Sequence, residues 1–209
     1  MSPKLQYFDL RGLGEYIRTL LIDNKIDFED ERIQMGEEWE AKKKTMPLGQ
    51  MPVWNEGEKS IPQSGAILRH LGRIHDLYGE NECDRVLIDV MQESLKDMRF
   101  KYAMQVVFGD FSKKDEYDKE TYPLELQKIE KLFKTRNEGK QFVLGEKLSF
   151  VDYVLFEELE LALTSNANNL DTVPVLKAFH QRFSQRPNLK EYLAKRAADK
   201  PVFHGNGKI

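Results

Sequence analysis

The change in hydrophobic pattern near residue 80 constrains the fold of this chain more than any other feature. Before it, short aromatic and β-branched runs alternate with helical patterns, in the order strand, helix, strand, helix, hairpin, helix. After it, apolar residues recur only at helical spacing. The sequence therefore predicts an α/β domain at residues 1–79 and an all-α domain at residues 80–209.

The elements of the first half have ordinary lengths. We expect strands at residues 4–8 and 28–33, a hairpin over 52–61 that turns at Asn55-Glu56-Gly57-Glu58, and helices at 15–24, 37–45 and 64–75. The alternation in the second strand is imperfect, and the middle helix is short and polar. These elements form one small layered unit.

The second half predicts a helical bundle. We expect helices at residues 84–111, 122–135, 149–162, 173–183 and 189–198. The third is mostly apolar, which predicts burial. Ser149 can accept from the amide three residues on while Asp152 reaches back to the Ser149 amide, as in a capping box. We interpret this pair as a folding device and not as catalytic machinery.

Composition excludes several classes of protein. The chain has 209 residues, 40% of them hydrophobic and 32% charged, which suits a globular protein. A net charge of −3 without a basic stripe argues against nucleic-acid binding. No apolar run is long enough to span a membrane, and the first residues lack the apolar core of a signal peptide. A single cysteine excludes an internal disulfide, so we expect a cytoplasmic protein without membrane or nucleic-acid partners.

The stretch from Met46 to Arg73 has the strongest local signal for a ligand. Pro52 immediately precedes an apolar pair that resembles a strand, where proline removes a ladder donor. Gln63 and Ser64 immediately precede a helical pattern, where a serine can cap the helix and the first amides face an anion. A loop fixed by proline beside a helix N-terminus suits a small, extended, negatively charged ligand.

Other candidate sites are weaker. His70 and His75 are five residues apart, which does not place them on one helix face, so we expect no metal site. Cys83 stands at a helix start, where a thiol pKa can fall, but without a partner a structural role is favoured. Gly12-Leu13-Gly14 lacks the remainder of a dinucleotide fingerprint.

Tyr7 is the best candidate for chemistry on position alone. It stands at the end of the first strand, beside a break that leads into a helix. Strand ends are where α/β sheets present side chains to ligands. On position alone a packing role is favoured over a catalytic one.

Several stretches taken together resemble the cytosolic glutathione transferase family over essentially the whole chain. They are Tyr7-Phe8-Asp9-Leu10-Arg11-Gly12, Gly49-Gln50-Met51-Pro52, Gln63 to Leu71, Ser149 to Tyr153, and the tail Gly205-Asn206-Gly207-Lys208. The run after Gln63 and the tail resemble the pi class. Trp39 and Lys43, followed by Thr45-Met46-Pro47, also resemble the sigma class.

The resemblance implies a fold and an activity. The fold would be a thioredoxin-like α/β N-terminal domain followed by an all-α helical C-terminal domain, assembled as a homodimer. The activity would be detoxification by conjugation of the cosubstrate glutathione to hydrophobic electrophiles, without a metal. Tyr7 would stabilise the glutathione thiolate, because a hydroxyl that donates to sulfur favours the charged form.

The resemblance also implies a set of glutathione contacts. Trp39, Lys43 and Gln50 would hold the glycine end, Met51 would offer its backbone to the cysteinyl part before a cis Pro52, Gln63 and Ser64 would hold the γ-glutamyl carboxylate, and Asp97 would reach the amine of the other subunit's glutathione. The active site would thereby be completed across the dimer.

Three departures from the family pattern affect the electrophile and the dimer. Leu13 stands where pi members often have arginine, Leu48 stands where an aromatic residue often enters the partner, and Val107 stands where a tyrosine often faces the electrophile. We expect a more apolar pocket. Its expected lining is Phe8, Leu13, Met35, Val107, Phe203 and Gly205.

Two alternatives remain open at this point. One is a glutathione-dependent isomerase of the prostaglandin-synthase kind. The other is a non-catalytic carrier or structural protein on the same fold, which retention of Tyr7 disfavours. A reductase with a cysteine nucleophile is disfavoured because no cysteine lies between Tyr7 and Glu15.

Overall fold

The computed structural model describes residues 2–208 and divides by contacts into two compact units. The first unit contains residues 1–71 and 185–209, and the second contains residues 72–184. By contact, the last helix and the tail therefore belong with the N-terminal sheet, although they follow the helical segment in sequence. The domain boundary predicted between residues 79 and 80 stays a prediction, because the two units are defined by contacts and the first is not one consecutive stretch of sequence.

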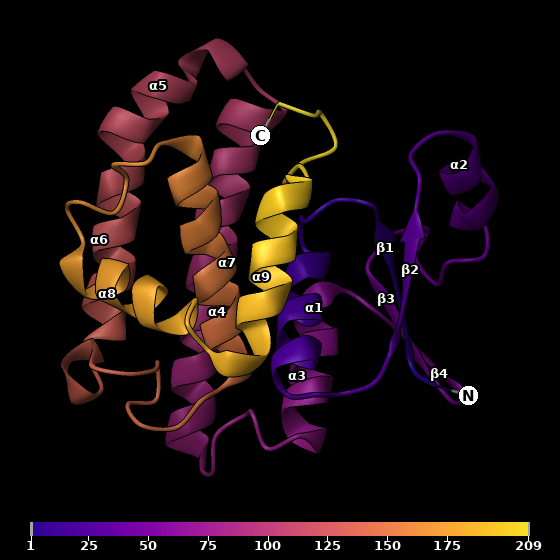
Figure 1. Ribbon diagram of the computed structural model, residues 1–209, viewed down its shortest axis with the longest axis horizontal. Coiled ribbons are helices and arrows are strands. Elements are labelled where there is room, and N and C mark those ends of the chain that lie inside the picture. Colours follow the sequence, from indigo (N-terminus) through magenta and orange to yellow (C-terminus); the bar gives the residue numbers. More distant parts are fainter. Residues whose placement is uncertain (1, 209) are drawn as a thin grey trace. The chain divides into compact units, whose positions relative to one another are not determined.

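A mixed four-stranded sheet forms the centre of the first unit, in the order β2-β1-β3-β4. Its strands are β1 (Lys4–Phe8), β2 (Glu29–Ile33), β3 (Val53–Glu56) and β4 (Lys59–Pro62) (Figure 1). β1 runs parallel to β2 and antiparallel to β3, and β3 runs antiparallel to β4. The C-terminal ends of β1, β2 and β4 and the N-terminal end of β3 therefore lie at one edge of the sheet.

The helices of the first unit match the predicted pattern closely. They are α1 (Gly14–Asp23), α2 (Glu37–Lys43), α3 (Ser64–Ile74, whose last residues fall in the second unit) and α9 (Pro187–Asp199). α1 packs against α9, so the end of the chain covers a helix near its start (Figure 1). All of α1 except Ile22 is buried, including its charged residues.

The second unit is helical. Its main helices are α4 (Glu82–Tyr102), α6 (Tyr122–Phe133), α7 (Phe150–Ser165) and α8 (Pro174–Phe183). Together with the sheet of the first unit, they confirm the predicted class of an α/β part followed by an all-α part. None of the helices within residues 2–208 has both the length and the apolarity needed to cross a membrane.

The prediction of one α-helix over residues 84–111 was wrong at its end. After Tyr102 the chain continues as a π-helical turn, η1 (Ala103–Val107), in which the amides of Phe108 and Asp110 bond five residues back. Asp110 then caps a new start, accepting from the Ser112 amide at 3.0 Å. The chain proceeds through short turns, η2 (Phe111–Lys113), α5 (Lys114–Glu116) and η3 (Tyr117–Thr121), which the sequence analysis missed.

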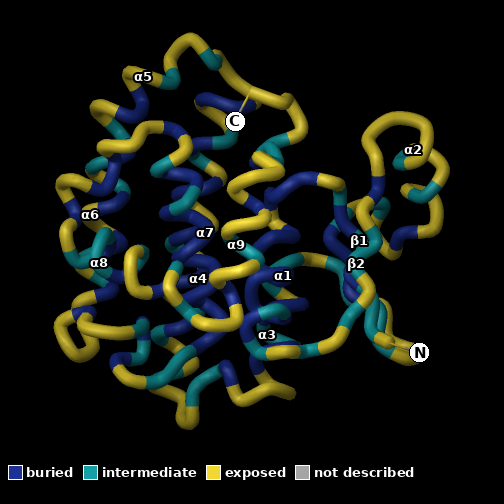
Figure 2. Tube along the Cα trace, viewed as in Figure 1, coloured by how far each residue is buried: buried dark blue, intermediate teal, exposed yellow. Residues whose placement is uncertain are grey.

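α7 forms the core of the second unit and is buried along almost its whole length (Figure 2). The predicted capping box at its start is confirmed. The Ser149 amide donates to Asp152 at 2.8 Å, and the Val143 amide donates to the second Asp152 oxygen at 2.8 Å. Asp152 therefore fixes both the helix start and the preceding loop.

Candidate active site

The register of the sheet gathers the predicted ligand-binding residues at one edge. Gln6 pairs with Val53, so Tyr7 at the end of β1 lies beside the start of β3, which Pro52 precedes. Val53 also pairs with Pro62, so Gln63 follows at the same edge. Three segments distant in sequence thus meet where β1, β3 and β4 leave the sheet.

Tyr7 is held at this edge by its own hydroxyl. Its side chain is 7% exposed, and the Leu13 amide donates to the hydroxyl oxygen at 3.0 Å. A hydrogen bond received at oxygen polarises the O–H group and strengthens it as a donor. The geometry of Leu13 therefore favours a Tyr7 hydroxyl that donates to a negatively charged atom.

Two glycines leave room for the Tyr7 side chain. A Cβ on Gly12 would lie 2.4 Å from the Tyr7 hydroxyl, and a Cβ on Gly14 would lie 2.4 Å from a ring carbon. Gly12 also has a φ of +44°, which favours glycine. In sequence this glycine pair is visible only as a fragment of a dinucleotide fingerprint, whereas in the structure it allows the close approach of the backbone to Tyr7.

A buried arginine fixes the chain immediately after Tyr7. Arg18 is fully buried and donates to the carbonyl oxygen of Leu10 at 2.8 Å and of Phe8 at 3.3 Å. It also forms two hydrogen bonds of 3.0 Å with the Asp30 carboxylate. Sequence reasoning missed this residue because nothing in a lone arginine on a helix signals burial.

Glu15 connects Arg18 to the last helix. It accepts from Arg18 at 3.3 Å, from Tyr192 at 2.6 Å and from Arg196 at 2.9 Å. Burial alone would raise the pKa of Glu15, but the charges of Arg196 and Arg18 and the hydrogen bond from Tyr192 lower it overall. Glu15 is therefore held as a carboxylate between two cations.

Trp39 and Met51 line the loop side of the same edge. Both pack against a buried cluster of Ile33, Met46 and Val53. The Trp39 ring also meets Phe8 edge-on, with centroids 5.1 Å apart. The Met51–Pro52 peptide bond is cis, as the resemblance implies.

Gln50 and Gln63 are brought together, although thirteen residues separate them. Gln63 Nε2 donates to Gln50 Oε1 at 3.1 Å. Gln63 has a φ of +75°, an uncommon conformation for a residue with a side chain. That turn leads directly into α3, so Ser64 stands at a helix N-terminus, where backbone amides and the helix dipole favour an anion.

The two neighbouring lysines of α2 differ in their partners. Lys42 forms an ion pair with Glu31, whereas Lys43 is exposed and forms no ion pair within residues 2–208. A Cβ on Gly49 would lie 3.8 Å from the Lys43 side chain, so Lys43 lies beside the loop that contains Gln50.

The residues predicted to line the electrophile pocket fall in both units. Leu13 is 37% and Met35 50% exposed, and a Cβ on Gly205 would lie 2.2 Å from Met35. Phe203 is 2% exposed, with the Arg11 guanidinium 3.5 Å from its ring centre. Phe8 is half-buried.

Asp97 and Val107 belong to the second unit. Val107 lies buried in η1, with Phe108 75% exposed beside it. Asp97 is exposed on α4, on the same helix face as the exposed Val90 and Phe100.

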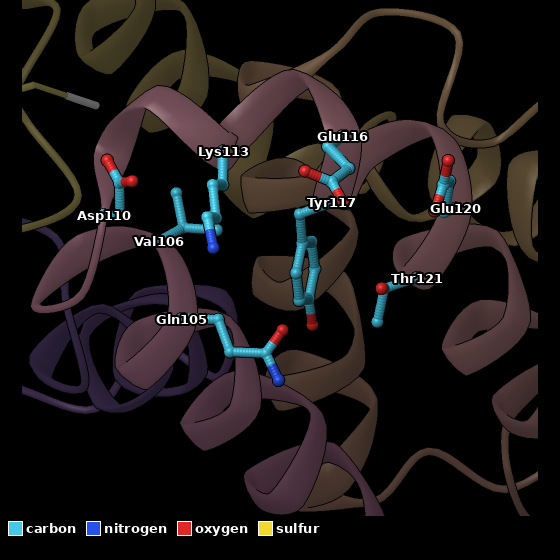
Figure 3. A pocket seen from close by; sticks show the side chains of 8 residues that line it. All are labelled: Gln105, Val106, Asp110, Lys113, Glu116, Tyr117, Glu120 and Thr121. Carbon is cyan, nitrogen blue, oxygen red and sulfur yellow. The ribbon is translucent and has the colours of Figure 1, made fainter.

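A cavity of about 350 Å³ lies in the second unit between η1 and η3 (Figure 3). Glu116, Glu120, Asp110 and Lys113 line it, with the Tyr117 side chain between them. Most of its lining residues are polar or charged, although their apolar atoms form about half of the wall. None of the predicted site residues lines it.

Comparisons with known proteins cover both parts of the chain. Residues 3–73 match the N-terminal domain of glutathione S-transferase, and residues 96–196 match its C-terminal domain. The chain is 47% identical to glutathione S-transferase P of Caenorhabditis elegans and 46% identical to a glutathione S-transferase of Dirofilaria immitis, each over 100% of both chains.

A solved structure is similar over the same range. The pi-class glutathione S-transferase of Onchocerca volvulus is 45% identical, with a TM-score of 0.96 over 100% of both chains. This confirms the resemblance and the fold class inferred from the sequence. Full-length identity at this level, on a fold that brings Tyr7, Pro52 and Gln63 to one sheet edge, establishes that the chain belongs to the glutathione S-transferase family.

Proposed function

We propose that this glutathione transferase conjugates reduced glutathione to hydrophobic electrophiles in the cytoplasm, with Tyr7 stabilising the thiolate. The observation that carries the proposal is the placement of Tyr7. Its buried hydroxyl accepts from the Leu13 amide at the sheet edge shared by Pro52 and Gln63. This geometry supports a hydroxyl that donates to a thiolate sulfur.

The energy of such a bond is sufficient for the role. A thiol with a pKa of about 8.5 is mostly protonated at neutral pH. A hydrogen bond to a charged atom contributes about 1.5–3 kcal/mol, which lowers the pKa by about one to two units. Tyr7 thereby raises the thiolate fraction about 8- to 25-fold at pH 7.

The chemical step needs only the thiolate and an electrophile. The thiol proton leaves to solvent before attack. The sulfur electron pair then forms a bond to carbon, and the leaving group departs with its own pair. The hydroxyl of Tyr7 remains protonated throughout, so its role is to stabilise charge and not to transfer a proton.

The remaining contacts are assigned along the same edge. Gln63 and Ser64 hold the γ-glutamyl carboxylate at the N-terminus of α3, where the helix dipole favours negative charge. The Met51 backbone, beside the cis Pro52, pairs with the cysteinyl part. At the glycine end, Trp39, Gln50 and the exposed Lys43 face the third part of the peptide. The electrophile then meets Phe8, Leu13, Met35, Val107, Phe203 and Gly205.

A homodimer completes this proposal. The face of α4 that carries Asp97 also exposes apolar side chains, Val86 at 52%, Val90 at 47% and Phe100 at 65%, and Met104 in the following η1 turn is 51% exposed. A second copy of the chain would cover this stripe and bring Asp97 to the amine of its glutathione. Leu48, 58% exposed, provides a further apolar contact.

Conjugation of glutathione to chlorodinitrobenzene tests the proposal. We expect turnover by the wild type, a thiolate absorbance in the bound state, and a loss of about 8- to 25-fold in Tyr7→Phe at pH 7. Tyr122→Phe is the matched control, since Tyr122 is buried in the second unit and should leave turnover unchanged. Turnover by Tyr7→Phe equal to that of the wild type would remove the assigned role.

One observation favours a second candidate. The chain is 32% identical to a structure described as prostaglandin synthase D of Nilaparvata lugens, with a TM-score of 0.81 over 94% of this chain and 98% of that one. A glutathione-dependent isomerase would use the same thiolate and release glutathione unchanged. Consumption of glutathione with one electrophile and its recovery with a prostaglandin endoperoxide distinguish the two activities, and a carrier would show neither.

A further inference from the structure

We infer that the C-terminal segment Val202–Gly205 is a positioning strap that holds the Arg11–Leu13 loop against Tyr7. The inference rests on the proposed role of Tyr7 and assigns to the strap the correct placement of its hydroxyl. Residues 2–71 and the segment after residue 185 belong to one compact unit, so the strap and Tyr7 share a framework.

The strap binds the loop through its backbone. The Arg11 amide donates to the Val202 carbonyl at 2.9 Å, and the Gly12 amide donates to the Phe203 carbonyl at 3.0 Å. The next amide along the loop, that of Leu13, donates to the Tyr7 hydroxyl at 3.0 Å. Three consecutive loop amides therefore all donate hydrogen bonds. The first two donate to carbonyls of the strap, and the third donates to the Tyr7 hydroxyl.

Side chains lock the same pairing. Phe203 is 2% exposed, and the Arg11 guanidinium lies 3.5 Å from its ring centre, within the range of a cation–π contact. Gly205 lies close enough to Met35 that an added Cβ would come within 2.2 Å of it. The strap therefore contacts the loop after β1 and the loop after β2.

The loop needs an external support because it lies beyond the sheet. β1 ends at Phe8, and α1 begins at Gly14. Gly12 in between has a φ of +44° and approaches the Tyr7 hydroxyl too closely for any side chain. A small rotation of this loop would move the Leu13 amide away from the hydroxyl, and displacements of about 1 Å are enough to lower rates strongly.

The strap is distinct from the contacts that attach α9. Glu15 accepts a hydrogen bond from Tyr192 and forms an ion pair with Arg196, both before residue 200. Removal of residues after 201 therefore keeps the helix and its buried ion pairs. This separation makes a truncation informative.

The test compares two C-terminal truncations, each made in the otherwise whole protein. One lacks residues 202–209 and so loses the strap, and its control lacks residues 206–209 and retains Val202, Phe203 and Gly205. The readouts are the pKa of bound glutathione from thiolate absorbance, the glutathione Kd, and far-ultraviolet circular dichroism. We expect the strapless chain to raise the thiol pKa by about one unit with a Kd within about threefold of wild type, and the control to match wild type.

Phe203→Leu provides a second variant that keeps an apolar side chain in place. It should raise the thiol pKa by a smaller amount than the truncation. Tyr7→Phe should raise the thiol pKa less in the strapless chain than in the full-length chain, since both changes act on one effect. A strapless chain that folds and keeps the wild-type thiol pKa would overturn the inference. The inference would also be overturned if Phe203→Leu and the strapless chain both lost glutathione affinity without any change in the thiol pKa.

Failure of the proposed function gives a different result. In that case the full-length chain would not lower the thiol pKa, and Tyr7→Phe would have no effect. The inference about the strap would then be overturned as well, because the lowered thiol pKa that the strap is said to support would be absent. The two failures are therefore read from separate measurements.

Discussion

The Glu15 carboxylate accepts a hydrogen bond of 2.9 Å from Arg196, a residue 181 positions later in the chain. Both residues are buried, and Arg18 lies on the other side of the carboxylate. Removing one partner of a buried ion pair leaves an uncompensated charge and typically costs about 3–5 kcal/mol. This single carboxylate therefore attaches α9 to the helix that follows Tyr7.

Glu15→Gln should lower the free energy of unfolding by about 3 kcal/mol, because Arg196 and Arg18 would lose their shared counter-charge. Urea denaturation measures the change. Lys96→Ala is the control, since it removes an exposed ion pair with Glu93 and should change stability by less than about 1 kcal/mol. If the two substitutions lowered the free energy of unfolding equally, burial of the Glu15 ion pairs would not be the reason for their contribution to stability.

The contribution of Glu15 should depend on pH in a defined direction. Its pKa in the folded protein lies below the unfolded value of 4.5: burial alone would raise it, but the charges of Arg196 and Arg18 lower it overall. The stabilisation is therefore present above pH 4.5 and is lost as the pH falls through the folded-state pKa. Denaturation between pH 7 and pH 3 should show the gap between wild type and Glu15→Gln narrowing in acid, and a constant gap would refute it.

Gly14→Ala should lower both activity and stability, because the new Cβ would lie 2.4 Å from the Tyr7 ring. We expect a loss of at least about 1–3 kcal/mol, as for other overpacking substitutions. The loss of stability should be smaller in a Tyr7→Ala background, where the ring is absent, and a double-mutant cycle measures the difference. Additive effects would show that the ring is not the obstacle.

Gln63→Ala should weaken glutathione binding without changing the thiol pKa of what still binds. Loss of a hydrogen bond to a charged carboxylate typically costs about 1.5–3 kcal/mol, or about 10- to 150-fold in Kd. Calorimetric titration gives the Kd, and thiolate absorbance gives the pKa. Asn55→Ala, in β3 and paired with Lys4 and Ser60, serves as the control for folding of β3. If the thiol pKa rose together with the Kd, Gln63 would contribute to thiolate stabilisation as well as to binding, contrary to this assignment.

Tyr122→Phe should leave stability at pH 7 unchanged or slightly higher. The Tyr122 hydroxyl is buried and has no hydrogen-bond partner within residues 2–208, so its removal relieves an unpaired polar group. Tyr78→Phe is the matched control, because that hydroxyl donates to Asp89 at 2.7 Å and its loss should cost about 1 kcal/mol.

The same tyrosine makes a prediction in alkali. Burial and the nearby charge of Glu158 raise the pKa of Tyr122 above its usual value of 10.0. Stability is therefore retained below pH 10.0 and declines above it, because the Tyr122 hydroxyl ionises in the unfolded chain while it stays protonated in the folded protein. Tyr122→Phe should decline less steeply than wild type between pH 9 and pH 11.

Local patterns predicted most of the secondary structure. Strand β1 occupies the predicted residues 4–8, and α3 ends one residue before the expected 75. The capping box at Ser149 was confirmed because both of its groups lie within four residues. Such signals depend on neighbours in sequence, which a single chain displays directly.

Long-range features were not predictable in the same way. The pairing of Arg11 and Gly12 with Val202 and Phe203 uses backbone groups, which leave no side-chain pattern. The burial of Arg18 depends on Asp30 and on two carbonyls. In the active site, the identity of Tyr7 came from resemblance, whereas the Leu13 amide that supports it could only be seen in three dimensions.

The unit that contains Tyr7 is assembled from both ends of the chain, residues 1–71 and 185–209, with the second unit inserted between them. During synthesis, the residues of the second unit emerge in one uninterrupted run, whereas the first unit waits for its final helix. Glutathione chemistry would thus depend on residues translated after the whole second unit. A ribosome that stops before α9 would release a chain with Tyr7 in its sequence and without its support.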